Sequence, residues 1–179
     1  MAPVQVWTVG HSTRTIADFL ALLKSNHICA LADVRRYPGS RRLPHFGHHA
    51  LARSLDEIGI VYQDFSELGG RRRPRVDSPN TAWRNAAFRG YADYMMTDEF
   101  RAGMARLLDL ARSTPTAVMC AEALWWQCHR GLLADDLKAN GSEVIHIIGP
   151  NKIEAHPFTS AARLVGGKLS YAAANLFDR

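Results

Sequence analysis

The chain has 179 residues, of which 47% are hydrophobic and 22% are charged. That length suits one globular domain with a real core and is too short for two ordinary domains, and the composition excludes disordered, collagen-like and coiled-coil proteins. Lys and Arg together number 22 against 17 Asp and Glu, so the formal net charge is +5. This surplus indicates an anionic partner.

The basic surplus is concentrated in one third of the sequence. Residues 33–90 contain 11 basic residues, all of them arginine, against 6 acidic ones, whereas the rest of the chain contains 11 of each. Arginine presents a planar fork of donors that suits phosphate and carboxylate groups. We therefore expect this segment to hold an anion, with a merely solvated arginine-rich surface as the alternative.

The N-terminal region and the cysteines bear on location. Residues 1–10 pass directly into a short apolar strand, without the basic and apolar regions of a signal peptide, and no run of about 18 apolar residues predicts a membrane span. The three cysteines, Cys29, Cys120 and Cys128, are too few for a disulfide framework in a chain of this size. We expect a cytoplasmic protein with reduced thiols and no membrane contact.

Strands and helices are predicted to alternate along the chain. In chain order, the apolar patterns predict a strand at residues 4–9, a helix at 15–25, a strand at 28–34, a helix at 48–57, a strand at 60–65, a helix at 98–111, a strand at 116–121, a helix from about 128 to 139 and a strand at 143–148. This order predicts an α/β three-layer sandwich, with a mainly parallel sheet of about five strands and helices on both faces. Residues 37–46 and 69–87 are expected to be long loops that are functional or mobile.

The same pattern predicts how the chain divides. We expect residues 1–150 to form a single α/β domain, because they contain all of the predicted strands and helices. Residues 151–179 are expected to form a C-terminal extension that packs on this domain or trails from it.

Polar residues follow four of the predicted strands, and in an open parallel sheet ligands bind beyond the carboxyl ends of the strands. We expect these candidate site residues to meet at one edge of the sheet. They are His11 and Ser12 after the first strand, Asp33, Arg35, Arg36 and Arg41 after the second, Gly69, Gly70 and Arg71 after the third, and Cys120 and Glu122 after the fourth, with Cys128, His129 and Arg130 opening the next helix.

Cys120 is expected where a buried strand opens into a loop. Nearby arginines and a helix N-terminus would lower its pKa and supply a thiolate, whereas the alternative is a small buried apolar side chain. Glu122 or His11 would then act as the acid or base, and Asp33 would orient a neighbouring base. A structural carboxylate–arginine pair is an equally good interpretation of Asp33 and of Glu122.

Further residues are candidates for ligand contact. His129 and Arg130 are expected in the first turn of a helix, which attracts anions, whereas Cys128 is expected to pack beneath that helix. The segment 69–73 combines a flexible glycine pair with three arginines, which suits an extended anion such as a nucleic-acid backbone. The adjacent Trp125 and Trp126 are interpreted either as a base-stacking platform or as an apolar lid.

Four motifs occur in a specific order and spacing. They are TVGHSTRT at residues 8–15, ADVRRYPGSRR at 32–42, LGGRRR at 68–73, and MCAE at 119–122 followed by CHR at 128–130. Together they resemble the domain of unknown function 488 family, over residues 8 to about 148. The resemblance implies a compact α/β fold with the Cys-Ala-Glu and Cys-His-Arg elements side by side, and it implies no reaction.

The favoured hypothesis is a cysteine-dependent enzyme that acts on a phosphorylated or nucleic-acid ligand. No cofactor is expected, because the P-loop and dinucleotide-binding motifs do not occur in the sequence. The nucleophile-elbow motif of a Ser-His-Asp hydrolase does not occur either. One alternative is a non-catalytic nucleic-acid-binding protein that serves repair or RNA handling. Another is a thiol redox or metal-binding protein built on Cys120 and Cys128, although their spacing is not that of a structural zinc site and no metal is predicted. A disulfide between them would need Cα atoms within about 7 Å.

Overall fold

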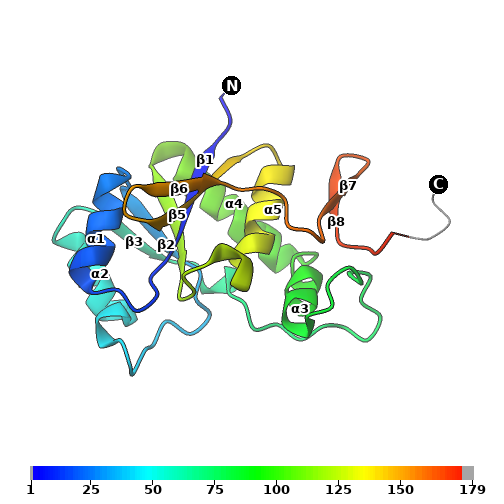
Figure 1. The fold of residues 1–179 in the computed structure, drawn as a ribbon, viewed down its shortest axis with the longest axis horizontal. Helices are drawn as coiled ribbons and strands as arrows, with labels where there is room; N and C mark the ends of the chain where they lie inside the picture. Colours follow the sequence, from blue (N-terminus) through cyan, green and yellow to red (C-terminus); the bar gives the residue numbers. More distant parts are fainter. Residues whose placement is uncertain (1, 175–179) are drawn as a thin grey trace.

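A six-stranded sheet lies at the centre of the computed structural model, which describes residues 2–174 (Figure 1). Its strand order is β3-β2-β4-β1-β5-β6, and all neighbouring strands run parallel except β6, which is antiparallel to β5. The strands are β1 (Gln5–Gly10), β2 (Ala30–Asp33), β3 (Val61–Asp64), β4 (Thr116–Cys120), β5 (Glu143–Gly149) and β6 (Lys152–Ala155).

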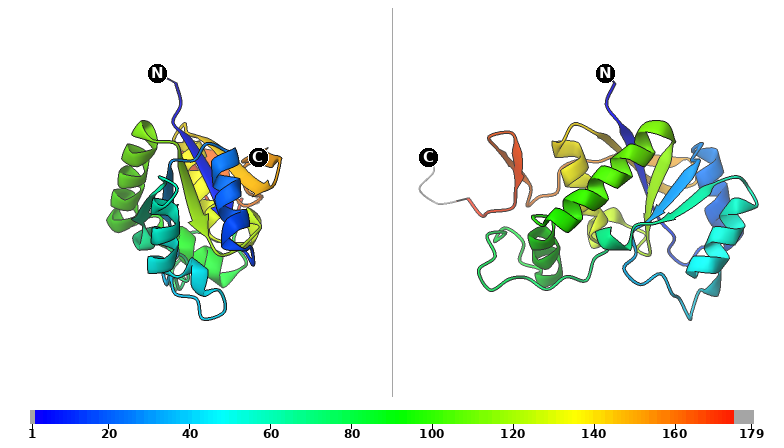
Figure 2. Two further views of the ribbon diagram at one scale, coloured as in Figure 1. Left: turned by 90° about the vertical axis from the view of Figure 1, so that its left-hand side faces the viewer. Right: turned by 180° about the vertical axis from the view of Figure 1, so that it is seen from behind.

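Helices cover both faces of this sheet (Figure 2). One layer consists of α1 (Ile16–Ser25) and α2 (His48–Asp56), and the other consists of α3 (Ala86–Tyr94), α4 (Asp98–Ser113) and α5 (Arg130–Ala139). Single 3-10 turns occur at η1 (Pro44–Phe46), η2 (Ser66–Leu68) and η3 (Trp125–Gln127), and a hairpin is formed by β7 (Arg163–Val165) and β8 (Lys168–Ser170). The predicted three-layer α/β sandwich is confirmed.

Each face of the sheet has its own apolar core. The α1 and α2 side buries Phe19, Leu22, Leu23, Leu51 and Leu55 against strand residues that include Ala117 and Met119. The opposite side buries Phe100, Met104, Leu107, Leu132, Leu133 and Leu137 against strand residues that include Val118 and Cys120. Each fully buried Leu or Phe contributes about 1.5–3 kcal/mol. Because side chains alternate along β4, Cys120 faces α4 and α5 rather than α1 and α2.

Helix α3 was not predicted, and its first residues overlap the end of the expected loop at residues 69–87. It begins at Asn85, whose side chain accepts hydrogen bonds from the N–H groups of Ala87 and Phe88. A Cβ atom on Gly90, within this helix, would lie 2.1 Å from the carbonyl oxygen of Arg72. The helix therefore packs directly on the backbone of the arginine-rich segment, and the glycine that permits this contact also weakens the helical pattern in the sequence.

The carboxyl ends of β1 and β4 meet closely. The backbone N–H of His11 donates to the carbonyl of Cys120, and the N–H of Ser12 donates to that of Ala121, both at 2.9 Å. A Cβ atom placed on Gly10 would lie 1.7 Å from the carbonyl oxygen of Glu122. Only glycine fits at this crossing, which brings the end of β1 against the loop that follows Cys120.

We expect the substitution Gly10→Ala to lower the free energy of unfolding by about 3 kcal/mol, because the added methyl must displace the backbone of the loop after β4. Gly39→Ala is the matched control: no atom lies within 4 Å of its Cβ position, so a change within about 0.5 kcal/mol is expected. Chemical denaturation followed by circular dichroism measures both values. Equal stability of the two variants would contradict the close crossing.

Candidate functional site

Two cysteines that are eight positions apart meet at the carboxyl edge of the sheet. Cys120 is the last residue of β4, and Cys128 lies two residues before α5. The loop between them, which contains η3, folds back so that their sulfur atoms lie 3.2 Å apart. Both side chains are buried, with exposed fractions of 2% for Cys120 and 8% for Cys128.

The two thiols have different environments. Cys128 Sγ contacts the Cys120 thiol and accepts the backbone N–H of Arg130 at 3.4 Å. The hydrogen bond from Cys120, with further help from the Arg130 guanidinium and against the effect of burial, lowers the pKa of Cys128 to about 6. Burial and the same hydrogen bond raise the pKa of Cys120 well above its usual value. Cys128 is therefore the thiolate of the pair, and Cys120 keeps its proton.

The Arg130 side chain lies beneath this pair and is 1% exposed. One terminal nitrogen donates to Thr8 Oγ1 at 3.2 Å, and the other donates to the carbonyl oxygens of Glu122 at 2.6 Å and Ala123 at 3.2 Å. These contacts engage both ends of the guanidinium fork within the protein. Arg130 therefore holds the loop after β4 in place and stabilises the thiolate from below.

A chain of buried polar groups continues from Arg130 to Asp135. Thr8 Oγ1 lies 2.6 Å from His146 Nδ1, His146 Nε2 lies 2.9 Å from His156 Nδ1, and His156 Nε2 lies 2.9 Å from Asp135 Oδ1. A carboxylate oxygen accepts, so His156 donates to it. With one proton on each imidazole ring, every donor then points from Arg130 towards Asp135. The chain connects a buried cation to a buried anion.

Residues near the end of the described chain complete the surroundings of Asp135. Its carboxylate accepts the N–H of Thr159 at 2.9 Å, the Thr159 hydroxyl at 2.5 Å and the Tyr171 hydroxyl at 2.8 Å. Burial, followed by the neighbouring His156 and Arg130, lowers the pKa of His146 to about 2, so that its ring is neutral. Trp125 stacks on this ring with centroids 4.7 Å apart, whereas its neighbour Trp126 is 49% exposed.

A small pocket opens above the cysteine pair. Its volume is about 160 Å³, and its lining consists of Arg35, Arg36, Tyr37, Gly70, Arg71, Cys120, Ala121, Glu122, Cys128 and His129. Burial and the Arg130 charge lower the pKa of His129 to about 4, so that it is neutral. Its Nε2 atom has no hydrogen-bond partner within residues 2–174. We call this cavity the cysteine pocket.

A second, basic pocket of about 460 Å³ adjoins the cysteine pocket, because Arg36 and Arg71 line both. Its other lining residues are Arg72, Arg73, Arg75, Gly90, Asp93, Tyr94 and Thr97. Arg36 donates to the carbonyl of Arg71 at 2.8 Å, and the Arg72 guanidinium lies 3.7 Å from the centre of the Tyr94 ring. Within the described chain, Arg71 and Arg73 form no ion pair, so their charges are available to an anion.

Close backbone approaches shape the wall between these pockets. A Cβ atom on Gly70 would lie 2.8 Å from His129 Nδ1, and one on Gly69 would lie 2.6 Å from Arg36 Cβ. Arg71 itself has a φ of 58°, a left-handed conformation that side chains rarely adopt. The glycine pair thus lets the arginine segment run against His129 and the end of β2.

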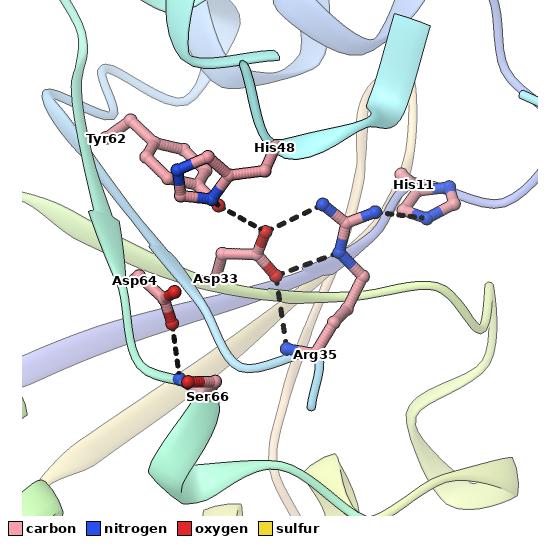
Figure 3. Close-up of polar contacts among 7 residues, drawn as sticks. All are labelled: His11, Asp33, Arg35, His48, Tyr62, Asp64 and Ser66. Atoms are coloured by element: carbon pink, nitrogen blue, oxygen red, sulfur yellow. Dashed lines mark hydrogen bonds and ion pairs between the residues drawn. The ribbon is translucent and has the colours of Figure 1, made fainter. Parts of the chain in front are cut away.

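Figure 3 shows a separate polar cluster at the end of β2. Arg35 forms a two-pronged ion pair with Asp33, at 2.9 and 2.7 Å, and the Tyr62 hydroxyl donates to the same carboxylate at 2.7 Å. Asp33 and Arg35 are both buried. His48 Nδ1 lies 3.0 Å from the Tyr62 oxygen, so the cluster reaches α2. The carboxylate is fully engaged in holding Arg35.

His11 belongs to this cluster rather than to the cysteine pair. Its Nδ1 donates to the carbonyl of Ser12 at 2.8 Å, and its Nε2 faces Arg35 at 3.4 Å (Figure 3). The ring stacks on Phe46 with centroids 4.3 Å apart. Burial is the main cause that lowers the pKa of His11 to about 4, so the ring is neutral. Both ring nitrogens therefore have partners within the protein.

The structure divides the predicted site residues into two groups. Those that line the cysteine pocket are Cys120, Glu122, Arg35, Arg36, Gly70, Arg71, Cys128 and His129. Those outside its lining are His11, Ser12, Asp33, Arg41, Gly69 and Arg130. Ser12 has a φ of 51°, and Arg41 is exposed. Arg35 is the link between the groups, because it contacts both Asp33 and His11 and also lines the pocket.

Sequence reasoning missed the polar chain behind Arg130. Thr8 and His146 lie inside apolar strands, where the period of two marks them only as members of a strand. Asp135 and His156 come from α5 and from the residue after β6. No spacing in the sequence connects these four residues. The one available signal was the presence of His146 in an apolar strand and of Asp135 on the buried side of a helix.

Comparison with known proteins places the chain in a family. The family model described as Domain of unknown function DUF488 matches residues 15–137, which is more than half of the chain. The chain therefore belongs to this family, and the resemblance drawn from its motifs is confirmed. No curated protein matches the chain. No solved structure matches it either.

No helix in residues 2–174 has the length and apolar character needed to cross a membrane. Within the same residues, no three His, Cys, Asp or Glu side chains are grouped so that they could hold a metal ion.

The reactivity of Cys128 should depend on pH in a distinctive way. In a Cys29→Ser background, we expect alkylation of Cys128 by iodoacetamide to be half-maximal near pH 6 and to slow as the thiolate is protonated below that pH. An ordinary thiol reaches half-maximal rate at about pH 8.5. In Cys120→Ala the midpoint should move up, because the hydrogen bond to the thiolate is lost. Peptide mass spectrometry gives the rate at each pH, and a wild-type midpoint above pH 8 would contradict the assignment.

Proposed function

We propose that this protein is a cysteine-dependent enzyme that acts on an anionic ligand, either a phosphorylated compound or a nucleic acid, at the carboxyl edge of its sheet. The observation that carries the proposal is the cysteine pair, with its sulfurs 3.2 Å apart, in a pocket that is also lined by three arginines. A low-pKa cysteine beside cationic groups in a cleft is the arrangement that nucleophilic catalysis requires.

In this proposal Cys128 is the nucleophile. The sequence favoured Cys120 for that role, but the structure favours Cys128, whose sulfur accepts a backbone N–H and which is the more exposed residue of the two. Cys120 holds a proton at the adjacent sulfur and can return it when a leaving group departs. Glu122, an exposed carboxylate in the pocket lining, is the candidate base for an attacking water.

The arginines would recognise the anion. Arg71 and Arg73 are exposed and form no ion pair within residues 2–174, and Arg36 lies between the two pockets. Five arginines line the basic pocket beside the cysteine pocket, which favours a ligand with several negative charges over one with a single charge. Tyr37, which is 63% exposed in the cysteine pocket, offers a surface on which a base can stack.

A non-catalytic nucleic-acid-binding protein is the second candidate. The five-arginine lining of the basic pocket favours it, because binding to a phosphate backbone requires charge and no reactive thiol. It assigns no role to the Cys128 thiolate. The two candidates therefore differ in what happens when Cys128 is replaced.

Binding to single-stranded nucleic acid should fall steeply with salt. For a fluorescein-labelled 20-nucleotide DNA or RNA strand, we expect the double variant Arg71→Ala/Arg73→Ala to bind more weakly and to reduce the slope of log K against log salt by about 1.4, which is 0.7 for each phosphate contact. Fluorescence anisotropy between 50 and about 300 mM salt gives the slope. Arg53→Ala, at an exposed position on α2, is the control that should leave the slope unchanged. Failure of the wild-type protein to bind either strand at 50 mM salt contradicts a nucleic-acid ligand.

Turnover should require Cys128. The protein is incubated with single-stranded DNA and RNA oligonucleotides and with nucleoside mono-, di- and triphosphates, and products are identified by mass spectrometry. We expect Cys128→Ser to lower the rate for the converted compound by about 10³-fold or more, as loss of a nucleophile does. Cys29→Ser, at an exposed thiol, should retain full activity. Undiminished turnover in Cys128→Ser rules out the thiolate mechanism, and binding without turnover favours the second candidate.

A further inference from the structure

The direct contact between the two sulfur atoms allows more than the hydrogen bond that lowers the pKa of Cys128. The Cys128 sulfur also accepts the backbone N–H of Arg130. The Sγ–Sγ distance of the pair is 3.2 Å, compared with about 2.05 Å in a disulfide bond. An approach of little more than 1 Å therefore separates the two thiols from a covalent bond.

We propose that Cys120 and Cys128 are a redox site that forms a reversible intramolecular disulfide, with Cys128 as the cysteine that reacts with a peroxide and Cys120 as the resolving cysteine. This inference rests on the proposed function only in taking Cys128 as the reactive thiol. It adds a second activity to that thiol, because the disulfide withdraws the nucleophile from use until a dithiol reduces it.

Access and contact assign the two roles. Both cysteines line the cysteine pocket, but Cys128 is 8% exposed and Cys120 is 2% exposed. The attacking sulfur must meet the oxidant, whereas the resolving sulfur needs only to reach its partner. The pocket volume of about 160 Å³ exceeds the roughly 30 Å³ occupied by a water molecule and admits a peroxide of similar size.

The proposed chemistry balances in two steps. First, the Cys128 thiolate attacks one oxygen of hydrogen peroxide, the O–O bond breaks, and hydroxide leaves, so that Cys128 becomes a sulfenic acid. Second, Cys120 gives up its proton and attacks the Cys128 sulfur, the S–O bond breaks, and the departing hydroxide takes that proton as water. The first hydroxide is protonated by solvent. Overall, two thiols are oxidised and one peroxide is reduced to two waters.

The surrounding loop can accommodate this change. Residues 121, 122, 126 and 127, between the cysteines, are exposed, whereas Trp125 is buried, so part of this turn borders on solvent. Its fixed points are the carbonyls of Glu122 and Ala123, which accept from Arg130. Disulfide formation removes the thiolate charge beside Arg130, so oxidation also changes the electrostatics of the pocket. Capture by Cys120 protects Cys128 from irreversible oxidation to the sulfinic acid.

The test uses the full chain in a Cys29→Ser background, so that the two pocket cysteines are the only thiols. Both lie in the tryptic peptide 113–130, because no Lys or Arg occurs between Arg112 and Arg130. One equivalent of hydrogen peroxide should make this peptide lighter by two hydrogen atoms and remove both thiols from titration under denaturing conditions. Dithiothreitol should restore the original mass and both thiols.

Single variants separate the two roles. In Cys120→Ser, peroxide should leave a Cys128 sulfenic acid that dimedone traps, followed by the sulfinic acid. In Cys128→Ser, peroxide consumption should slow at least 10-fold, because the remaining Cys120 thiol is protonated. Oxidation of the parent protein to the sulfinic acid without a disulfide would overturn the proposal, and so would equal rates in the two variants.

The readout also separates this inference from the proposed function. Peptide mass reports the disulfide without any ligand. A protein that forms the disulfide and converts no ligand supports the redox site and contradicts the enzymatic proposal. A protein that converts a ligand through Cys128 and forms no disulfide supports the enzymatic proposal and overturns the redox site.

Discussion

The site depends on the burial of one positive charge, the Arg130 guanidinium. Moving an ion of this kind out of water costs several kcal/mol unless acceptors and an opposite charge replace the lost hydration. The protein supplies a hydroxyl and two backbone carbonyls in direct contact, a thiolate above, and a carboxylate reached through two histidines. Strands β1 and β5, helix α5 and the segment after β6 all contribute. This arrangement also contributes to the acidity of Cys128, because the buried Arg130 charge favours the ionised form of the thiol.

A second buried cation shapes the pocket from the opposite face of the sheet. Arg35 is neutralised by Asp33, with Tyr62 and His11 completing its surroundings (Figure 3). Arg35 thus lines the cysteine pocket, and Arg130 lies outside its lining but contacts Cys128, each cation already compensated by the protein. The arginines at 71 and 73 differ from them, because they are exposed and form no ion pair within residues 2–174. The interior charges are therefore neutralised by the protein itself, whereas the charges of Arg71 and Arg73 are open to solvent.

The sequence predicted the architecture well, because short apolar runs rich in β-branched residues alternate with segments of helical periodicity. This alternation is typical of a parallel sheet with helices on both faces. It also predicted that polar strand ends would gather at one edge. It could not predict which face each side chain would take, because a shift of one residue at a strand end reverses the direction. His11 and Asp33 therefore lie with α1 and α2, whereas Cys120 lies with α4 and α5. The contact between Cys120 and Cys128 depends on a loop conformation that residue spacing does not reveal.

The position of Asp135 along the chain has a consequence for biosynthesis. Its partners are His156, Thr159 and Tyr171, which follow it by more than twenty residues. Protein synthesis proceeds from the N-terminus, so both cysteines and Arg130 are made before these partners exist. During that interval the Asp135 carboxylate lacks its hydrogen-bond donors, and His156, which connects His146 to Asp135, is not yet present. The buried polar chain behind Arg130 is therefore completed late, and a nascent chain that already contains both cysteines does not yet contain this polar chain in full.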